Sequence, residues 1–182
     1  MADILVLANE YTTLLNFRME LLDELLDSGY RVIVALPPNP SNGIFARAGC
    51  KVVEVPLERF GKDPLADLRL LFAYIWLIRS IKPQAVLTYT AKPNVYGGLA
   101  CRLLKIPCIC NVTGISSALQ SGGLMRWLML SMQRAAFNKA HTVFFQNVGN
   151  MRIYKQRQVV GNQAVLLPGS GVNLEQSKLE PY

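Results

Sequence analysis

Acidic side chains are missing from most of the second half of this sequence. Residues 68–174 carry twelve lysines and arginines but no aspartate or glutamate. A stretch of that length at average composition would carry roughly a dozen acids. Residues 1–67, in contrast, hold ten acids and six basic residues. The unopposed positive field of the second half favours anionic partners: phosphates, an anionic membrane surface or nucleic acid.

Long apolar runs are also missing. The longest, residues 70–78 ("LLFAYIWLI"), is nine residues between Arg69 and Arg79, whereas a membrane-spanning helix needs about 20. The apolar start at residues 4–8 is too short for a signal peptide. We therefore expect a cytoplasmic chain that does not cross a membrane.

The residue types that build metal sites and nucleophilic triads are scarce. The chain has one histidine, His141, which we expect to be structural, and four cysteines without C-x-x-C spacing. Cys108 and Cys110 lie two apart in a strand-like run, so they point to one face and cannot form an ordinary disulfide with each other. We expect four reduced thiols, no metal site and no Ser-His-Asp or Cys-His system.

Cofactor-binding motifs are absent as well. The loop after the first expected strand, "LANEYTTLLNFR", contains no glycine, so it lacks the G-x-G-x-x-G fingerprint of dinucleotide sites. No G-x-x-x-x-G-K-[ST] motif occurs anywhere in the chain. These absences argue against a nicotinamide or flavin enzyme, and we expect no cofactor.

Short apolar runs alternate with helical patterns over residues 1–172. The expected strands are residues 3–8, 31–36, 51–55, 84–89, 107–112, 142–147 and 164–168. The expected helices are residues 15–28, 43–48, 64–82, 93–105, 123–140 and 148–156. This alternation predicts one α/β domain: a Rossmann-like, doubly wound, mostly parallel sheet of about seven strands.

Ligands of such a sheet bind beyond the carboxyl ends of the strands, where loops 9–14, 88–94, 111–121 and 146–150 are expected. The first loop offers Glu10 and Thr12. Asn16 and Arg18 follow, in the expected first turn of the next helix. A cation is unfavourable at a helix N-terminus, so Arg18 indicates either an anionic ligand or a pairing with a nearby glutamate.

Two further loops carry polar side chains. Thr90, Lys92 and Asn94 accompany an expected helix start, an arrangement that favours an anion and is also common in solvated loops. The next loop has little charge and several hydrogen-bonding groups, which suits a sugar or a phosphate. Its candidate residues are Asn111, Thr113, Gly114 and Ser116.

The expected helix 123–140 is apolar with a basic stripe. Arg126 and Arg134 lie on nearly the same face, with Trp127 beside Arg126. Such a helix can lie in a membrane interface. The alternative is a core helix with one solvated edge.

Four segments together resemble the N-terminal domain of family 4 glycosyltransferases. They are "NFRMELLDELLDSGYRVIVALP", "IKPQAVLTYTAKPNVYGGLACRLLKIPCICNVTGISSAL", "KAHTVFFQN" and "VLLPGSGVNLE". This family consists of retaining enzymes with the GT-B fold. It includes bacterial enzymes that extend lipid-linked sugars in capsule, lipopolysaccharide and glycoprotein pathways.

The resemblance implies two Rossmann-like domains with the active site between them. Residues 1–172 would be the acceptor-binding domain, and residues 173–182 would begin the linker to a donor-binding domain that this chain lacks. That domain would bind a nucleotide sugar, expected to be UDP-linked, and carry a paired-glutamate motif. The chain alone would then be inactive, with its own C-terminal domain as its natural partner.

The resemblance also implies roles for individual residues. Asn16 and Arg18 would lie near the phosphates, Thr90, Lys92 and Asn94 on the acceptor side, and Thr113 and Gly114 at the reaction centre. Many relatives have a histidine in the loop that reads "NVTG" here, and this sequence does not. No catalytic base is therefore assigned; retention in such enzymes is usually attributed to substrate-assisted chemistry.

A polyprenyl-diphosphate-linked acceptor would hold the enzyme peripherally at the inner face of the cytoplasmic membrane, in contact with its anionic surface. Two other classes stay open. A non-catalytic nucleotide- or nucleic-acid-binding module is suggested by the pI of about 9.4. However, no nucleic-acid-binding motif occurs in the sequence, and we expect no nucleic acid to bind. A complete small hydrolase would need a nucleophile elbow, which the sequence lacks.

Overall fold

A computed structural model describes residues 1–57, 63–114 and 123–171. Its seven strands form one parallel sheet in the order β3-β2-β1-β4-β5-β6-β7. They are β1 (Asp3–Leu7), β2 (Arg31–Leu36), β3 (Lys51–Glu54), β4 (Ala85–Tyr89), β5 (Cys108–Val112), β6 (Thr142–Phe145) and β7 (Ala164–Leu166). The predicted doubly wound, Rossmann-like sheet of about seven strands is confirmed.

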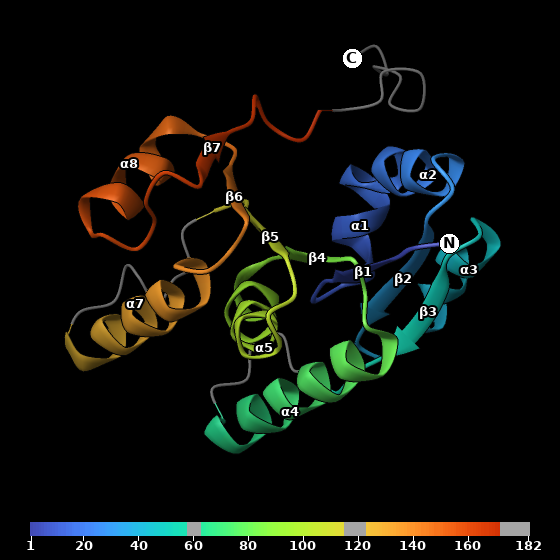
Figure 1. Cartoon of the computed structure of the whole chain (residues 1–182), viewed down its shortest axis with the longest axis horizontal. Coiled ribbons are helices and arrows are strands. Elements are labelled where there is room, and N and C mark those ends of the chain that lie inside the picture. The colour runs from blue at the N-terminus through green and yellow to red at the C-terminus, as the bar shows by residue number, and fades with distance from the viewer. Residues whose placement is uncertain (58–62, 115–122, 172–182) are drawn as a thin grey trace, which may run out of the picture.

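Helices cover both faces of the sheet (Figure 1). One face carries α1 (Tyr11–Phe17), α2 (Met19–Asp27), the short turn η1 (Pro40–Asn42) and α3 (Gly43–Arg47). The other carries α4 (Pro64–Ile81), the π-helical segment η2 (Pro93–Gly97), α5 (Gly98–Leu104), α7 (Gly123–Phe137) and α8 (Val148–Gln156). Each face therefore has its own apolar core.

The side chains of β1 show why the sheet needs two helical layers. Leu5 and Leu7 belong to the core under α4, α5 and α7, whereas Ile4 and Val6 belong to the core under α2 and α3. Successive side chains of a strand point to opposite faces. An unbroken apolar run such as "ILVL" is therefore buried on both sides, as parallel sheets require.

The predicted helix 15–28 is two helices. α1 begins at Tyr11, earlier than expected, and α1 and α2 are separated by Arg18, whose φ of −140° and ψ of 2° are not helical. The expectation that Asn16 and Arg18 occupy the first turn of one helix is therefore wrong. Asn16 lies in the last turn of α1, and Arg18 lies at the break.

The helix expected from residue 93 begins at residue 91 and includes the π-helical segment η2. Pro93 is accommodated because it lies in the first turn, where its missing N–H has no intrahelical partner. Gly97 follows where the helix presses on the sheet. A Cβ at Gly97 would lie 2.7 Å from Leu7 Cδ1 and 3.1 Å from Thr88 Cγ2. Only glycine allows this approach to β1 and β4.

Candidate functional site

The sheet has a switch point between β1 and β4. From β1 the chain winds outward through β2 and β3, and from β4 it winds the other way through β5, β6 and β7. The loops after these two strands therefore diverge at the carboxyl edge of the sheet. Open α/β sheets bind their ligands at such a switch point.

Arg18 lies across this switch point. Its guanidinium carbon is 5.1 Å from the centroid of the Tyr89 ring at the end of β4. Its Nη2 donates to Ser170 Oγ at 3.1 Å, and its Nη1 donates to the carbonyl of Phe17 at 2.7 Å. Ser170 also accepts a hydrogen bond from Gln146, which follows β6. One cation thus links segments from both halves of the sheet.

Tyr89 serves as a neutral platform for that cation. Burial raises the pKa of Tyr89 to about 12, and the nearby Arg18 guanidinium acts in the opposite direction. A ring in contact with a guanidinium face is a favourable cation–π arrangement. The Tyr89 ring and the Ser170 hydroxyl hold the charge of Arg18 in place, and among the described residues no carboxylate forms an ion pair with it.

A buried hydrogen-bond network ties the ends of β4 and β5 to η2. Thr88 donates to Asn94 Oδ1 at 2.6 Å, Asn94 Nδ2 donates to the carbonyl of Asn111 at 2.8 Å, and Asn111 Nδ2 donates to the carbonyl of Thr88 at 3.3 Å. All three side chains are buried. Asn94 and Asn111 were predicted to bind substrate. The structure uses their amides to set the positions of the strand ends.

Thr90 follows β4 with a φ of +74°. This left-handed conformation is an outlier for a β-branched residue and is characteristic of functional sites. The Thr90 hydroxyl donates to the carbonyl of Tyr89. The strained backbone turns the chain sharply from the strand into the following helix and leaves Thr90 at the edge of a cavity.

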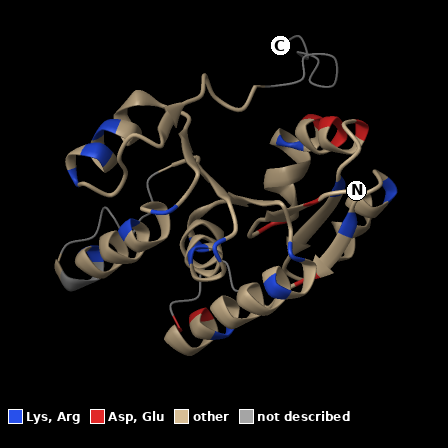
Figure 2. Ribbon diagram, viewed as in Figure 1, with Lys and Arg blue, Asp and Glu red and all other residues tan. Residues whose placement is uncertain are grey.

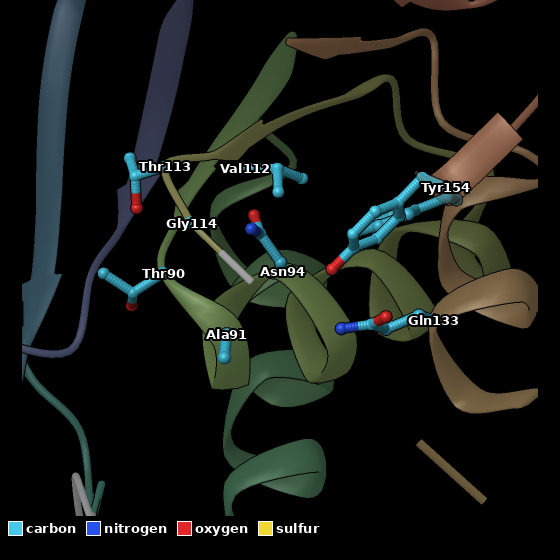
Figure 3. Close-up of a pocket in the computed structure, with 9 residues that line it drawn as sticks. Thr90, Ala91, Asn94, Val112, Thr113, Gly114, Gln133 and Tyr154 are labelled. Carbon is cyan, nitrogen blue, oxygen red and sulfur yellow. The ribbon is translucent and has the colours of Figure 1, made fainter. Parts of the chain in front are cut away.

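The cavity has a volume of about 30 Å³ and lies between the end of β5, η2, α7 and α8 (Figure 3). Its lining residues are Thr90, Ala91, Asn94, Val112, Thr113, Gly114, Gln133, Phe137 and Tyr154. Predicted residues from two loops therefore meet there: Thr90 and Asn94 after β4, and Thr113 and Gly114 after β5. Thr113 and Gly114 are exposed, so the cavity lies next to solvent.

Gln133 and Tyr154 form the inner wall of the cavity (Figure 3). Gln133 is 3% exposed, and its Oε1 has no hydrogen-bond partner among the described residues. Burial raises the pKa of Tyr154 to about 12, with Gln133 acting in the opposite direction. A buried carbonyl oxygen without a donor is unfavourable, so a hydrogen-bond donor that reached Gln133 Oε1 from the cavity would be favourable.

Lys92 forms an ion pair with α4. Its Nζ lies 2.6 Å from Asp67 Oδ1 on α4, and the Tyr96 hydroxyl donates to Asp67 Oδ2 at 2.9 Å. The side chains of Lys92 and Asp67 are 17% and 22% exposed. Lys92 therefore fastens the loop after β4 to the first turn of α4.

The other predicted residues are spread over the edge. Glu10 accepts a hydrogen bond from Thr13 at 3.1 Å, Thr12 is half-buried in α1 and Asn16 is exposed. Ser116 lies outside the described residues. Glu10, Thr12 and Asn16 are not among the described residues that line the cavity.

The three residues predicted to contact a membrane differ from one another. Arg126 and Trp127 are exposed on α7, Trp127 by 64%. Arg134 is engaged by the end of α8, because its Nε and Nη2 donate to the carbonyls of Gln158 and Arg157 at 3.0 and 2.8 Å. One of the two arginines of the expected basic stripe, Arg134, is therefore exposed but hydrogen-bonded to the end of α8.

Sequence reasoning missed Tyr89, Gln133, Tyr154 and Ser170. Tyr89 had a usable signal, since it ends a strand at the edge where ligands bind. Gln133 had a weaker one, because it is a polar residue on the apolar side of a helix. Tyr154 and Ser170 are far along the chain from their neighbours at the site, and nothing local marks them.

The described residues hold no group of three or more histidines, cysteines or acids placed to bind a metal ion. The four cysteines are buried and outside disulfides, and Cys108 and Cys110 share one face with their sulfurs 3.5 Å apart. No helix in the described part of the chain is long and apolar enough to cross a bilayer.

A family model described as glycosyl transferase 4-like matches residues 3–147. A curated relative from Campylobacter jejuni is N,N'-diacetylbacillosaminyl-diphospho-undecaprenol alpha-1,3-N-acetylgalactosaminyltransferase. It is 24% identical over 174 residues, which cover 93% of this chain and 46% of the relative. The chain therefore spans about half the length of that relative.

Two solved structures illustrate the fold. Acinetobacter baumannii MurG is 16% identical with a TM-score of 0.63, covering 98% of this chain and 48% of that one. Anabaena Alr3699/HepE, in complex with UDP and glucose, is 17% identical with a TM-score of 0.65, covering 100% and 47%. At these identities the likeness establishes the shared fold, again over about half of each neighbour.

Proposed function

Because this chain belongs to the glycosyl transferase 4-like family, we propose that it is the acceptor-binding half of a retaining glycosyltransferase. The enzyme would move a sugar from a nucleotide sugar to a glycan acceptor carried on a polyprenyl diphosphate. The curated relative acts on a diphospho-undecaprenol-linked sugar, which supports this class of acceptor. The Anabaena neighbour holds UDP and glucose, which supports a UDP-linked donor.

The observation that carries the proposal is Arg18 at the switch point. A diphosphate needs fixed cationic hydrogen-bond donors, and a guanidinium suits phosphate oxygens better than a compact ammonium does. Arg18 is half-exposed, stacked on Tyr89 and hydrogen-bonded to a neutral hydroxyl. A phosphate can take the place of Ser170 without breaking an ion pair. Arg18 is thus our proposed phosphate ligand.

We assign one polar group of the acceptor sugar, a hydroxyl or an N-acyl amide, to the cavity between β5 and α7, because a volume of about 30 Å³ holds a small group and not a whole sugar ring. Thr90 and Thr113 supply hydroxyls at its rim, and Gln133 supplies the unpartnered acceptor at its wall. A sugar hydroxyl or amide N–H would satisfy that acceptor. The described residues that line the cavity include no carboxylate and no histidine. We therefore propose no catalytic base in this half and assign the proton transfer to the substrates and the donor-binding half.

The proposed enzyme works at the inner face of the cytoplasmic membrane in the synthesis of a surface glycan such as capsule, lipopolysaccharide or glycoprotein glycan. A polyprenyl-linked acceptor cannot leave the bilayer, so the enzyme must come to it. The absence of acids from residues 68–174 supports attraction to an anionic surface.

The test is a transfer assay with radiolabelled UDP-sugars and undecaprenyl-diphosphate-linked sugars. The full-length gene product is expected to transfer sugar. The 182-residue chain alone is expected to show none, because it supplies one wall of the donor site. Transfer by the chain alone, or no transfer by the full-length protein with any UDP-sugar, would refute the proposal. Retention of configuration is read from the anomeric proton of the product.

A further inference from the structure

Helix α4 is apolar on both sides. Its inner side buries Leu70, Tyr74, Leu77 and Ile78. Its outer side exposes Leu65 by 64%, Leu68 by 48%, Phe72 by 61% and Trp76 by 67%. These four exposed residues, which we call the α4 stripe, follow the spacing three, four and four that places side chains on one helix face. The stripe extends about 16 Å along the helix axis.

A helix that packs on a sheet needs only one apolar side. The opposite side is normally polar, because exposed apolar area in water is unfavourable. Contiguous apolar surface on a folded domain marks a contact with another molecule. Leu103 of α5, which packs against α4, adds a further side chain that is 66% exposed.

Positive charge surrounds the α4 stripe. Arg69 is exposed between Leu68 and Phe72, and Arg79 is exposed beyond Trp76 on the same side of the helix. Lys82 and Lys105, which end α4 and α5, are also exposed. Arg102 of α5 is exposed as well, and its Nη1 donates to the carbonyl of Ala135 on α7 at 2.8 Å. The two acids at the start of α4 are Asp63, which caps the helix, and Asp67, which is paired with Lys92. Beyond Asp67 there is no acid up to residue 174.

This combination identifies the occupant. A second copy of the chain would bring like charges together at the contact. An anionic bilayer instead receives the apolar side chains in its acyl region and the arginines among its phosphates. Tryptophan is the side chain most typical of that boundary. We infer that the α4 stripe is a membrane-docking surface for an anionic bilayer.

The inference rests on the proposed function, since an acceptor carried on a membrane lipid requires a site at the bilayer. The structure links the two. Asp67, in the first turn of α4, holds Lys92 and Tyr96. Lys92 lies two residues after Thr90, at the rim of the cavity. The Asp67–Lys92 ion pair thus connects α4, the proposed bilayer-binding helix, to the segment that lines the proposed acceptor site.

The two tryptophans of the chain allow a direct test, because Trp76 is on α4 and Trp127 is on α7. Each is exposed to a similar extent, 67% and 64%. Trp127→Phe leaves Trp76 as the only indole reporter, and Trp76→Phe leaves Trp127. Each variant is titrated with vesicles of phosphatidylcholine, alone or mixed with phosphatidylglycerol, and with brominated lipid as a quencher.

Trp76 emission is expected to shift to the blue and to be quenched by brominated lipid, only with the anionic vesicles. Trp127 emission is expected to stay unchanged. A response of Trp127 alone would overturn the inference in favour of α7, and no response of Trp76 would overturn it outright. A blue shift of Trp76 that grows with protein concentration without vesicles would identify self-association, and also overturns it.

A second measurement uses matched surface variants. Phe72→Ser/Trp76→Ser is expected to lower vesicle affinity roughly tenfold or more, because two large apolar side chains lose their insertion. The control, Trp127→Ser/Leu128→Ser, removes a comparable exposed pair on α7 and is expected to change affinity less than about twofold. Equal losses in both variants would contradict the assignment to α4. The conservative Trp127→Phe titration decides the matter if the serine variants do not fold.

The transfer assay separates this inference from the proposed function. With full-length protein, Phe72→Ser/Trp76→Ser is expected to lower transfer to an acceptor embedded in vesicles and to leave transfer to a water-soluble short-chain acceptor unchanged. Loss with both acceptors would contradict docking as the role of the stripe. If the parent protein transfers to neither acceptor, the proposed function fails, while the fluorescence result still decides whether α4 meets the bilayer.

Discussion

Helices α2 and α4 cover opposite faces of the same sheet, yet their outer sides are opposites. α2 buries Leu22 and turns Glu20, Asp23, Glu24 and Asp27 outward. α4 buries a comparable apolar side and turns the α4 stripe outward. Figure 2 shows the same contrast in charge, with acids gathered on α2 and basic residues spread over α4 to α8. Packing on the sheet explains why the inner sides of both helices are apolar. Exposure to water explains the charged outer side of α2, but it does not explain the apolar outer side of α4.

The fold therefore accounts for the residue types on α2 but not for those on the outer side of α4. α2 is what a solvent-facing helix of this architecture requires, and its sequence could be read from the fold alone. The outer side of α4 contributes nothing to the core described here. Its apolar composition is therefore explained by a contact outside the domain. Substitutions on the outer side should change that contact, whereas substitutions on the inner side should change the stability of the core.

The largest effect is expected on the inner sides, where the two helices should be alike. Tyr74→Ala should lower the free energy of unfolding by about 3–5 kcal/mol and Leu22→Ala by about 2–5 kcal/mol, because both residues are fully buried. On the outer side, Phe72→Ala should change it by about 0.5 kcal/mol or less. Urea titration of the three variants measures this. A large loss for Phe72→Ala would show that the stripe belongs to the core.

Tyr74→Phe is the matched control for the inner side. The Tyr74 hydroxyl is buried without a hydrogen-bond partner among the described residues, and burial raises its pKa above the ordinary value. Removing that hydroxyl leaves the ring packing intact. The variant should be at least as stable as the parent, in contrast to Tyr74→Ala.

The comparison extends to two cations at the carboxyl edge, Arg18 before α2 and Lys92 beside α4. Arg18→Ala should lower kcat/KM of the full-length enzyme about ten- to a hundredfold, the effect of one lost charge-assisted hydrogen bond of about 1.5–3 kcal/mol, with little change in stability. Lys92→Ala should do the reverse and lower stability by about 1–2 kcal/mol, because Asp67 loses its ion-pair partner. Unchanged kinetics for Arg18→Ala would remove it from the site.

The charged residues of the two outer sides should differ in their effect on vesicle binding. Arg69→Gln/Arg79→Gln should weaken binding to anionic vesicles by about 2 kcal/mol in total, at about 1 kcal/mol per cation near the surface. Raising the salt concentration should mimic the variant. Asp23→Asn/Glu24→Gln on α2 changes the net charge by the same amount in the opposite direction and should change vesicle binding much less. Equal and opposite effects would mean that net charge, not the α4 surface, drives binding.

The smallest effect is expected on stability at low pH, and it arises in residues 1–67, because residues 68–174 carry no carboxylate side chains. Arg31 holds the pKa of Asp3 below its ordinary value, mainly through their hydrogen bonds, one of them 2.7 Å long. A carboxyl group whose pKa is lowered by folding stabilises the folded state at pH values above its unfolded pKa of about 3.9. This stabilisation is lost as the pH falls through the pKa of the folded state. Stability should therefore decline below about pH 4, and Arg31→Met should remove that part of the decline in acid titrations.

The fold and the family were predictable because their signals are local. Apolar runs of strand length alternate with helical patterns, and the two-sided burial of β1 follows from its unbroken apolar run. The resemblance to family 4 glycosyltransferases is confirmed by the match over residues 3–147. The break at Arg18 was not predictable, because α1 and α2 keep one continuous helical spacing and the residue that interrupts them is held by partners elsewhere in the chain.

The candidate site was predictable only as far as the strand ends. The sequence alone determined which loops lie at the carboxyl edge, that residues 68–174 are basic without acids, and that α4 contains a long apolar run, residues 70–78. Tertiary structure decided the rest. It paired Arg18 with Ser170, 152 residues away, turned Lys92 to Asp67, engaged Arg134 with α8 and left one apolar side of α4 uncovered. Periodicity records which side chains share a face, but whether a face meets another layer depends on contacts between residues far apart in the chain.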